Sequence, residues 1–178
     1  MTTYVALLRG VNVGGKMVSM AKLREMLESL GFADVRTLLQ SGNAVFGAPA
    51  KTAARLEQQL EAATAKHLGI TCDYHVRTAA ELQAAIDANP MTAQADKDPS
   101  RFTVTFYKAP LDAAAVKAAQ AAIQGPEILG ADGRHLYMYW PDGQGNSKAG
   151  AAVGKVLKVN GTARNWNTVL KLAALTAK

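Results

Sequence analysis

The order of apolar runs and helical patterns over residues 3–76 limits the fold of this chain more than any other feature. Leu23, Met26 and Leu27 repeat at the spacing of one helix face. Ser41 and Gly42 separate two strand-like runs, which is a hairpin signal. The expected elements are a strand over 3–8, a helix from Ser19, strands over 35–40 and 43–47, a helix over 51–68 and a strand over 70–76. This βαββαβ order predicts a ferredoxin-like unit.

A similar order begins again in the second half of the chain. A helix over 78–88 is followed by the polar stretch 89–99, which contains Pro90 and Pro99. The expected elements beyond it are a strand over 101–108, a helix over 112–123, strands over 127–129 and 135–140, and a helix over 148–157. This order is βαββα and lacks the last strand of the first half. The final segment, TARNWNTVLKLAAL, predicts a helix that Thr162 or Asn165 can cap.

These elements define the predicted fold class and domain organisation. We expect an α+β protein of two ferredoxin-like (βαββαβ-type) subdomains with mainly antiparallel sheets and a C-terminal helix. The N-terminal subdomain is expected over residues 1–88. A linker over 89–99 joins it to a C-terminal subdomain over 100–178, which includes the terminal helix.

The positive charge of the chain is concentrated near its C-terminus. The formal net charge is +6, and residues 143–178 contain basic side chains but no acidic ones. The basic residues there are Lys148, Lys155, Lys158, Arg164, Lys171 and Lys178. A basic stretch of this kind indicates an anionic partner, and the alternative is a solvated basic surface.

Several classes of protein are disfavoured by the composition. No apolar run approaches the roughly 20 residues of a membrane span, and Arg9 follows the first apolar run rather than preceding it, unlike a secretory signal. Cys72 is a single cysteine, so no internal disulfide is expected. The three histidines show no ligand spacing. We therefore expect a cytoplasmic protein without a metal, a cofactor or a membrane partner.

The glycine-rich segment LLRGVNVGGKM comes close to a phosphate-binding loop. Gly10, Gly15 and Lys16 fit that pattern, but Met17 stands where a Ser or Thr must ligate Mg²⁺. The hairpin signal at Ser41 also favours an antiparallel sheet, whereas such loops belong to parallel sheets. The segment is therefore not predicted to be a nucleotide-hydrolysing loop. It remains either a tight strand-to-helix connection or an anion-binding corner.

Three segments, LLRGVNVGGK, VRTLLQSGNAVF and TARNWNTVLKL, together resemble a bacterial family catalogued as domain of unknown function 1697. The resemblance covers most of residues 5–46 and residues 162–172. It implies two ferredoxin-like subdomains, in agreement with the pattern of elements, and it implies no activity.

The same segments supply the candidate site. Their polar and glycine residues are hydrogen-bond donors, amides and fixed positive charges, which suit an anionic ligand. The candidate anion-binding residues are Arg9, Asn12, Gly14, Gly15, Lys16, Ser41, Asn43, Arg164, Asn165 and Asn167. The expected partner is an anionic small molecule, nucleotide-like in character, or the phosphate backbone of a nucleic acid.

Two alternatives stay open at the level of sequence. The first is an enzyme that acts on a phosphate- or carboxylate-bearing substrate, for which no catalytic residue is identified. The second is a structural or oligomerising protein without a ligand, in which Asn165 and Asn167 cap a helix and Ser41 to Asn43 close a hairpin. The sequence does not say whether the first and last segments form one site.

Overall fold

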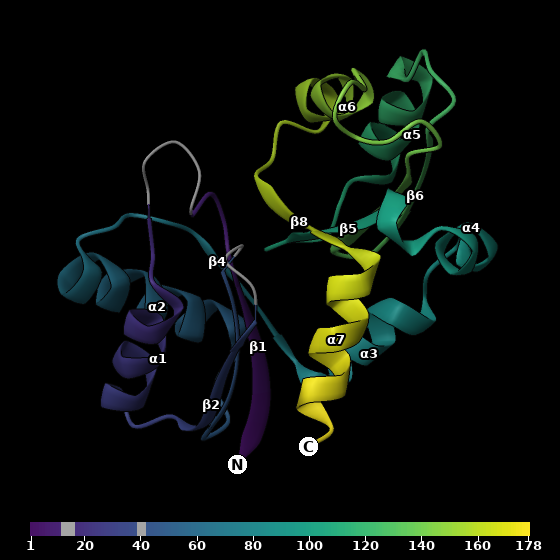
Figure 1. The fold of residues 1–178 in the computed structure, drawn as a ribbon. Helices are drawn as coiled ribbons and strands as arrows, with labels where there is room; N and C mark the ends of the chain where they lie inside the picture. Colours follow the sequence, from purple (N-terminus) through teal and green to yellow (C-terminus); the bar gives the residue numbers. More distant parts are fainter. Residues whose placement is uncertain (12–16, 39–41) are drawn as a thin grey trace. The chain divides into compact units, whose positions relative to one another are not determined.

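The computed structural model describes residues 1–11, 17–38 and 42–178 and divides the chain into two compact units (Figure 1). Unit 1 consists of Met1–Gln83 with Lys171–Lys178, and unit 2 of Ala84–Leu170. The elements of the first half are β1 (Thr2–Leu8), α1 (Met20–Ser29), β2 (Ala33–Leu38), β3 (Asn43–Ala48), α2 (Ala53–Leu68), β4 (Tyr74–Thr78) and α3 (Ala79–Asp87).

The sheet of unit 1 has the strand order β2-β3-β1-β4, and each neighbouring pair is antiparallel. Helices α1 and α2 pack on one face of it (Figure 1). Side chains that alternate along the strands, such as Tyr4 and Ala6, meet Leu23 and Leu56 of the helices in this core. Sequence signals fix the helix ends: the Ser19 hydroxyl accepts from the Lys22 N–H, and α2 ends at a left-handed glycine.

Unit 2 contains a second sheet of the same kind. Its further elements are α4 (Thr92–Lys97), η1 (Pro99–Arg101), β5 (Phe102–Tyr107), α5 (Ala113–Ala122), β6 (Ile128–Asp132), β7 (His135–Tyr139), α6 (Ala149–Leu157), β8 (Gly161–Asn165) and the start of α7 (Trp166–Thr176). The strand order β6-β7-β5-β8 is antiparallel throughout. Helices α5 and α6 lie against one face, over a core that includes Tyr107, Leu136 and Trp140 (Figure 1).

The predicted fold class is confirmed, with two corrections to the strands. The second half is a full βαββαβ order, because β8 supplies the last strand that the sequence pattern lacked. β8 begins at Gly161, where a Cβ would lie 2.7 Å from Tyr107 and 2.9 Å from the Phe106 carbonyl oxygen. Strand β4 begins at Tyr74 rather than at residue 70, since β1 ends at its partner Leu8. Cys72 therefore lies outside the strand, although it is buried.

The stretch 89–99, expected as a linker, contains helix α4 and the start of η1. Asn89, Met91 and Ala95 are buried, and the Asn89 side-chain oxygen accepts a hydrogen bond from the Met91 N–H. Pro90 packs so closely on β6 that a Cβ at Gly130 would lie 2.6 Å from it. The subdomain boundaries 1–88 and 100–178 stay a prediction.

No helix in the described part of the chain has both the length and the apolar character needed to cross a membrane.

Candidate functional site

The first two motif segments meet at one end of the sheet of unit 1. The Leu8 N–H donates to the Gly42 carbonyl at 2.9 Å, and the Arg9 N–H donates to the Asp73 carbonyl at 2.9 Å. Gly42 has φ +82°, and a Cβ there would lie 2.6 Å from Val11 Cγ2 and 2.9 Å from Leu8 Cβ. Only glycine fits this position. Gly42, just before β3, therefore lies directly against Leu8 and Val11.

Five of the candidate residues fall outside the described residues. They are Asn12, Gly14, Gly15, Lys16 and Ser41. The structure describes the residues next to them, of which Val11 and Gly42 are in contact. Val11 and Gly42, each of which borders one of the undescribed stretches, are therefore neighbours in the fold.

Arg9 and Asn43 are the candidate residues of these two segments that the structure describes, and their environments differ. Arg9 is exposed just beyond β1, before Gly10 with φ +70°. Asn43 is fully buried opposite Leu7, and its Nδ2 donates to the Leu38 carbonyl at 2.9 Å. Asn43 thus ties the two strands of the hairpin together, whereas the Arg9 side chain is accessible to a ligand.

The third segment lies in unit 2 up to Leu170. Its arginine is on a strand rather than at a helix end. Arg164 is opposite Val104 on the edge strand β8 and is 6% exposed. Its Nη1 donates to Thr162 Oγ1 at 2.7 Å and to the Ala163 carbonyl at 2.9 Å. Burial lowers the pKa of Arg164 to about 10.

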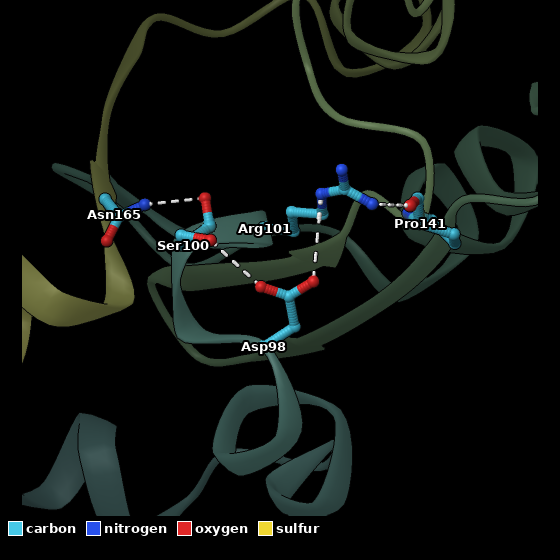
Figure 2. A network of polar contacts seen from close by, with 5 residues as sticks. All are labelled: Asp98, Ser100, Arg101, Pro141 and Asn165. Carbon is cyan, nitrogen blue, oxygen red and sulfur yellow. Dashed lines mark hydrogen bonds and ion pairs between the residues drawn. The ribbon is translucent and has the colours of Figure 1, made fainter.

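Asn165 uses both ends of its amide within the protein, and Figure 2 shows the end that meets Ser100. Its Oδ1 accepts from the Asn167 N–H at 2.9 Å, which caps α7, and its Nδ2 donates to the Ser100 carbonyl at 2.9 Å. The Ser100 hydroxyl donates to Asp98 Oδ1 at 2.9 Å. Asn167 is exposed on the first turn of α7. These contacts favour a structural role for Asn165, whereas the Asn167 side chain is exposed.

Arg101 extends the same network to the loop after β7. Its Nη1 donates to the Pro141 carbonyl, and its Nε lies 3.7 Å from Asp98 Oδ2 (Figure 2). The Arg101 carbonyl accepts from the Trp140 N–H at 2.8 Å. The network therefore holds η1, β8 and the end of β7 in one arrangement.

Each sheet buries polar residues on the face that points away from its helix pair. In unit 1, Asn43 and His75 both lie opposite Leu7, and Arg77 lies opposite Val5. Arg77 is 1% exposed, and its Nη1 donates to the Val76 carbonyl at 3.0 Å. Residues paired across strands share a face of the sheet, so these three polar side chains lie on the same face.

The sheet of unit 2 repeats this arrangement. His135 and Thr162 lie opposite Phe106, in the places that Asn43 and His75 take beside Leu7. Arg77, His75 and His135 were not among the candidate residues predicted from the sequence. The available signal was the similarity of HVRT and TARN, each of which directly precedes a helix.

Comparisons with known proteins give a family and a fold. The family described as "Protein of unknown function (DUF1697)" matches residues 1–137. A solved structure of a conserved bacterial protein, SP0830 from Streptococcus pneumoniae, is similar with a TM-score of 0.74 and 29% sequence identity over 98% of each chain. No curated protein matches the chain.

Proposed function

The chain belongs to the DUF1697 family, and we propose that it binds an anionic ligand at the end of the first sheet where β1 and the β2–β3 hairpin meet. The observation that carries the proposal is the contact of Gly42 with Leu8 and Val11. This contact places Gly42, which directly follows Ser41 in the sequence, against Val11, which precedes the segment with Lys16. Glycine at 42 is required for the approach, so the convergence is built into the sequence.

The chemistry around this point suits an anion. Arg9 is exposed there, and the segments that follow add Asn12, Lys16 and Ser41 as donors, with Gly14 and Gly15 allowing backbone N–H groups to approach a ligand. None of these segments contains Asp or Glu, so nothing within them repels a negative charge. The expected ligand is a nucleotide-like small molecule in the cytoplasm.

Arg164, Asn165 and Asn167 are not assigned to the ligand in this proposal. Asn165 has its amide engaged at both ends, and Arg164 is buried. We assign the ligand to the first two segments and assign Arg164 and Asn165 to holding β8 and α7 in place.

A nucleic-acid backbone is the second candidate ligand. It is favoured by the exposure of all the lysines between residues 143 and 178 and by the absence of acidic residues there. Binding to a phosphate backbone falls steeply with salt, roughly in proportion to the number of phosphates contacted. A single nucleotide-like ligand shows one site per chain and a modest salt dependence.

Thermal unfolding tests the proposal. The wild type is unfolded with nucleotides, sugar phosphates, carboxylates and short oligonucleotides at low and moderate salt. A ligand at a concentration of about 100 times its Kd adds about 2.7 kcal/mol to the free energy of unfolding. For a chain of this length this raises the Tm by roughly 5 to 10 °C. Arg9→Ala and Lys16→Ala should abolish the shift. Arg55→Ala, which removes another exposed arginine of unit 1 from α2, should retain it.

The outcomes separate the alternatives. No shift with any compound overturns the proposal, and the polar segments are then turns and caps. A shift that Arg55→Ala removes as strongly as Arg9→Ala also overturns it. Turnover of a shifted compound, lost in Arg9→Ala while the variant stays folded, identifies an enzyme acting on an anionic substrate.

A further inference from the structure

A pocket of about 630 Å³ lies in unit 2 between the end of α5 and the start of α6. Much of its wall is made of small side chains, namely Ala122, Ala149, Ala151 and Ala152. The polar and charged residues of the wall are Gln124, Glu127, Asn146, Ser147, Lys148 and Lys155. The pocket therefore combines room for a small apolar group with a limited set of fixed charges.

Glu127 is the acidic member of the wall, and Ser147 positions its carboxylate. The Ser147 hydroxyl donates to Glu127 Oε1 and accepts from the Ala149 N–H at 3.1 Å. Glu127 Oε2 is shielded from solvent, and no donor reaches it from the residues that the structure describes. A carboxylate oxygen buried without a donor is unfavourable, so a donor in the pocket toward which the carboxylate can turn would stabilise it.

Gly125 holds the carboxylate where Ser147 can reach it. A Cβ at Gly125 would lie 2.3 Å from Glu127 Oε2 and 3.0 Å from Oε1. The carboxylate thus rests directly on the backbone of Gly125, and any side chain at 125 would displace it. Both residues line the pocket.

Two lysines supply the opposite charge. Lys148 follows Ser147 directly, and Lys155 lies seven residues further along, which is about two turns of α6. Both are exposed and line the pocket. A purely anionic ligand would meet the charge of Glu127, and a purely cationic one would meet the two lysines. A molecule with both charges is complementary to the pocket.

We propose that this pocket binds a small zwitterion whose ammonium group meets the Glu127 carboxylate and whose carboxylate or phosphate group meets Lys148 and Lys155. The alanine wall accommodates a short aliphatic part of the ligand. This site lies within unit 2 and uses none of the residues of the anion site proposed for unit 1, so the two proposals stand or fall separately.

Titration of the ¹⁵N-labelled protein, followed by amide NMR spectra, tests this. L-alanine and phosphoethanolamine serve as the zwitterions, one with a carboxylate and one with a phosphate. N-acetyl-L-alanine and ethylamine each carry only one of the two charges. Saturable changes at the amides of Gly125, Ser147 and Ala149 are expected with a zwitterion and not with the single-charge analogues. Comparing the affinities of the two zwitterions shows whether the pocket prefers a carboxylate or a phosphate group.

Variants complete the test. Glu127→Gln keeps the shape of the side chain and should weaken binding at least about tenfold, as expected for losing a charge-assisted hydrogen bond. Lys155→Ala changes only an exposed side chain and should also weaken it. Glu25→Gln, on the exposed surface of α1, should leave binding unchanged.

Three results would overturn the assignment: no saturable change with either zwitterion at millimolar concentration, equal binding of the single-charge analogues, or unchanged binding in both Glu127→Gln and Lys155→Ala. Should Glu127→Gln fold poorly, the analogues and Lys155→Ala decide the question alone. Arg9→Ala should bind the zwitterion as the wild type does, whatever the outcome for the anion site.

Discussion

Arg77 and Arg164 occupy equivalent places in two different sheets. Each lies on the last strand of its half, opposite a valine of the first strand, Val5 or Val104. Each donates from Nη1 to the carbonyl of the residue before it, and each is followed closely by a helix. The two halves thus share a buried arginine as well as a strand order.

The burial of Arg164 predicts an unusual pH dependence of stability. Burial lowers its pKa to about 10 in the folded protein, below the ordinary value of the unfolded chain. Above that pH the folded state releases the proton first, so the unfolded state binds more protons and the free energy of unfolding rises with pH. We expect the wild type to gain about 1 kcal/mol relative to Arg164→Met between roughly pH 9.5 and 11. Urea unfolding of both proteins across this range measures it, and a constant difference would contradict the prediction.

The pH dependence of stability that Tyr74 contributes should have the opposite sign to that of Arg164. Burial raises the pKa of Tyr74 although its hydroxyl shares a 2.7 Å hydrogen bond with Thr64 Oγ1. Above the ordinary tyrosine pKa the unfolded chain loses the phenolic proton while the folded protein keeps it. The contribution of Tyr74 to the free energy of unfolding is therefore full below about pH 10 and falls by about 1.4 kcal/mol per pH unit above it.

Tyr74→Phe isolates this effect. The variant lacks the titrating group, so the stability difference between wild type and variant should shrink as the pH rises from about 9 to 11. Urea unfolding at each pH gives the difference. A wild type that holds its advantage over the variant throughout would show that the phenol ionises equally in both states.

The strands with alternating apolar residues could be predicted from sequence, and β8 could not. In β8 the buried positions are Thr162 and Arg164, while Ala163 is exposed, so the usual apolar-in pattern is absent. In the expected strand over 70–76, Ile70 and Cys72 continue the apolar pattern beyond the point where β1 ends. In both cases the strand is defined by its pairing with a neighbouring strand: β8 pairs with β5, and β4 begins where β1 ends. The pattern of apolar residues in the sequence does not report such pairing.

The candidate site was predictable to the extent that its residues form motifs. Asn43 belongs to the SGN motif, and the structure gives it a contact that closes the hairpin. Arg77 and His75 belong to no motif. Their burial follows from both faces of the sheet being covered, since Val76 between them is buried too. A strand buried on both faces gives no polar alternation from which its inward polar residues can be recognised.

Replacing Gly42 should be costly for two separable reasons. Its φ of +82° disfavours any side chain, and a Cβ would also overlap Val11 and Leu8. Gly69 has φ +66°, and a Cβ there would have no neighbour within 4 Å, so Gly69→Ala carries the backbone penalty alone, about 1–2 kcal/mol. We expect Gly42→Ala to be less stable than Gly69→Ala by a further ~1–3 kcal/mol, the usual cost of overpacking. Equal losses on urea unfolding would mean that the contact relaxes freely.

Asn165 and Asn167 should differ in their importance for stability. Asn165→Ala removes the cap of α7 and leaves the Ser100 carbonyl without its donor, which should lower the free energy of unfolding by about 1–2 kcal/mol. Asn167→Ala changes an exposed side chain and should stay within about 0.5 kcal/mol of the wild type. Asn165→Asp keeps the oxygen that accepts from the Asn167 N–H but loses the donor to Ser100. Its stability should therefore lie between that of Asn165→Ala and that of Asn167→Ala. Urea unfolding of the three variants measures this order. A stable Asn165→Ala would show that the network around η1 does not support the fold, and would return Asn165 to the residues available for a ligand.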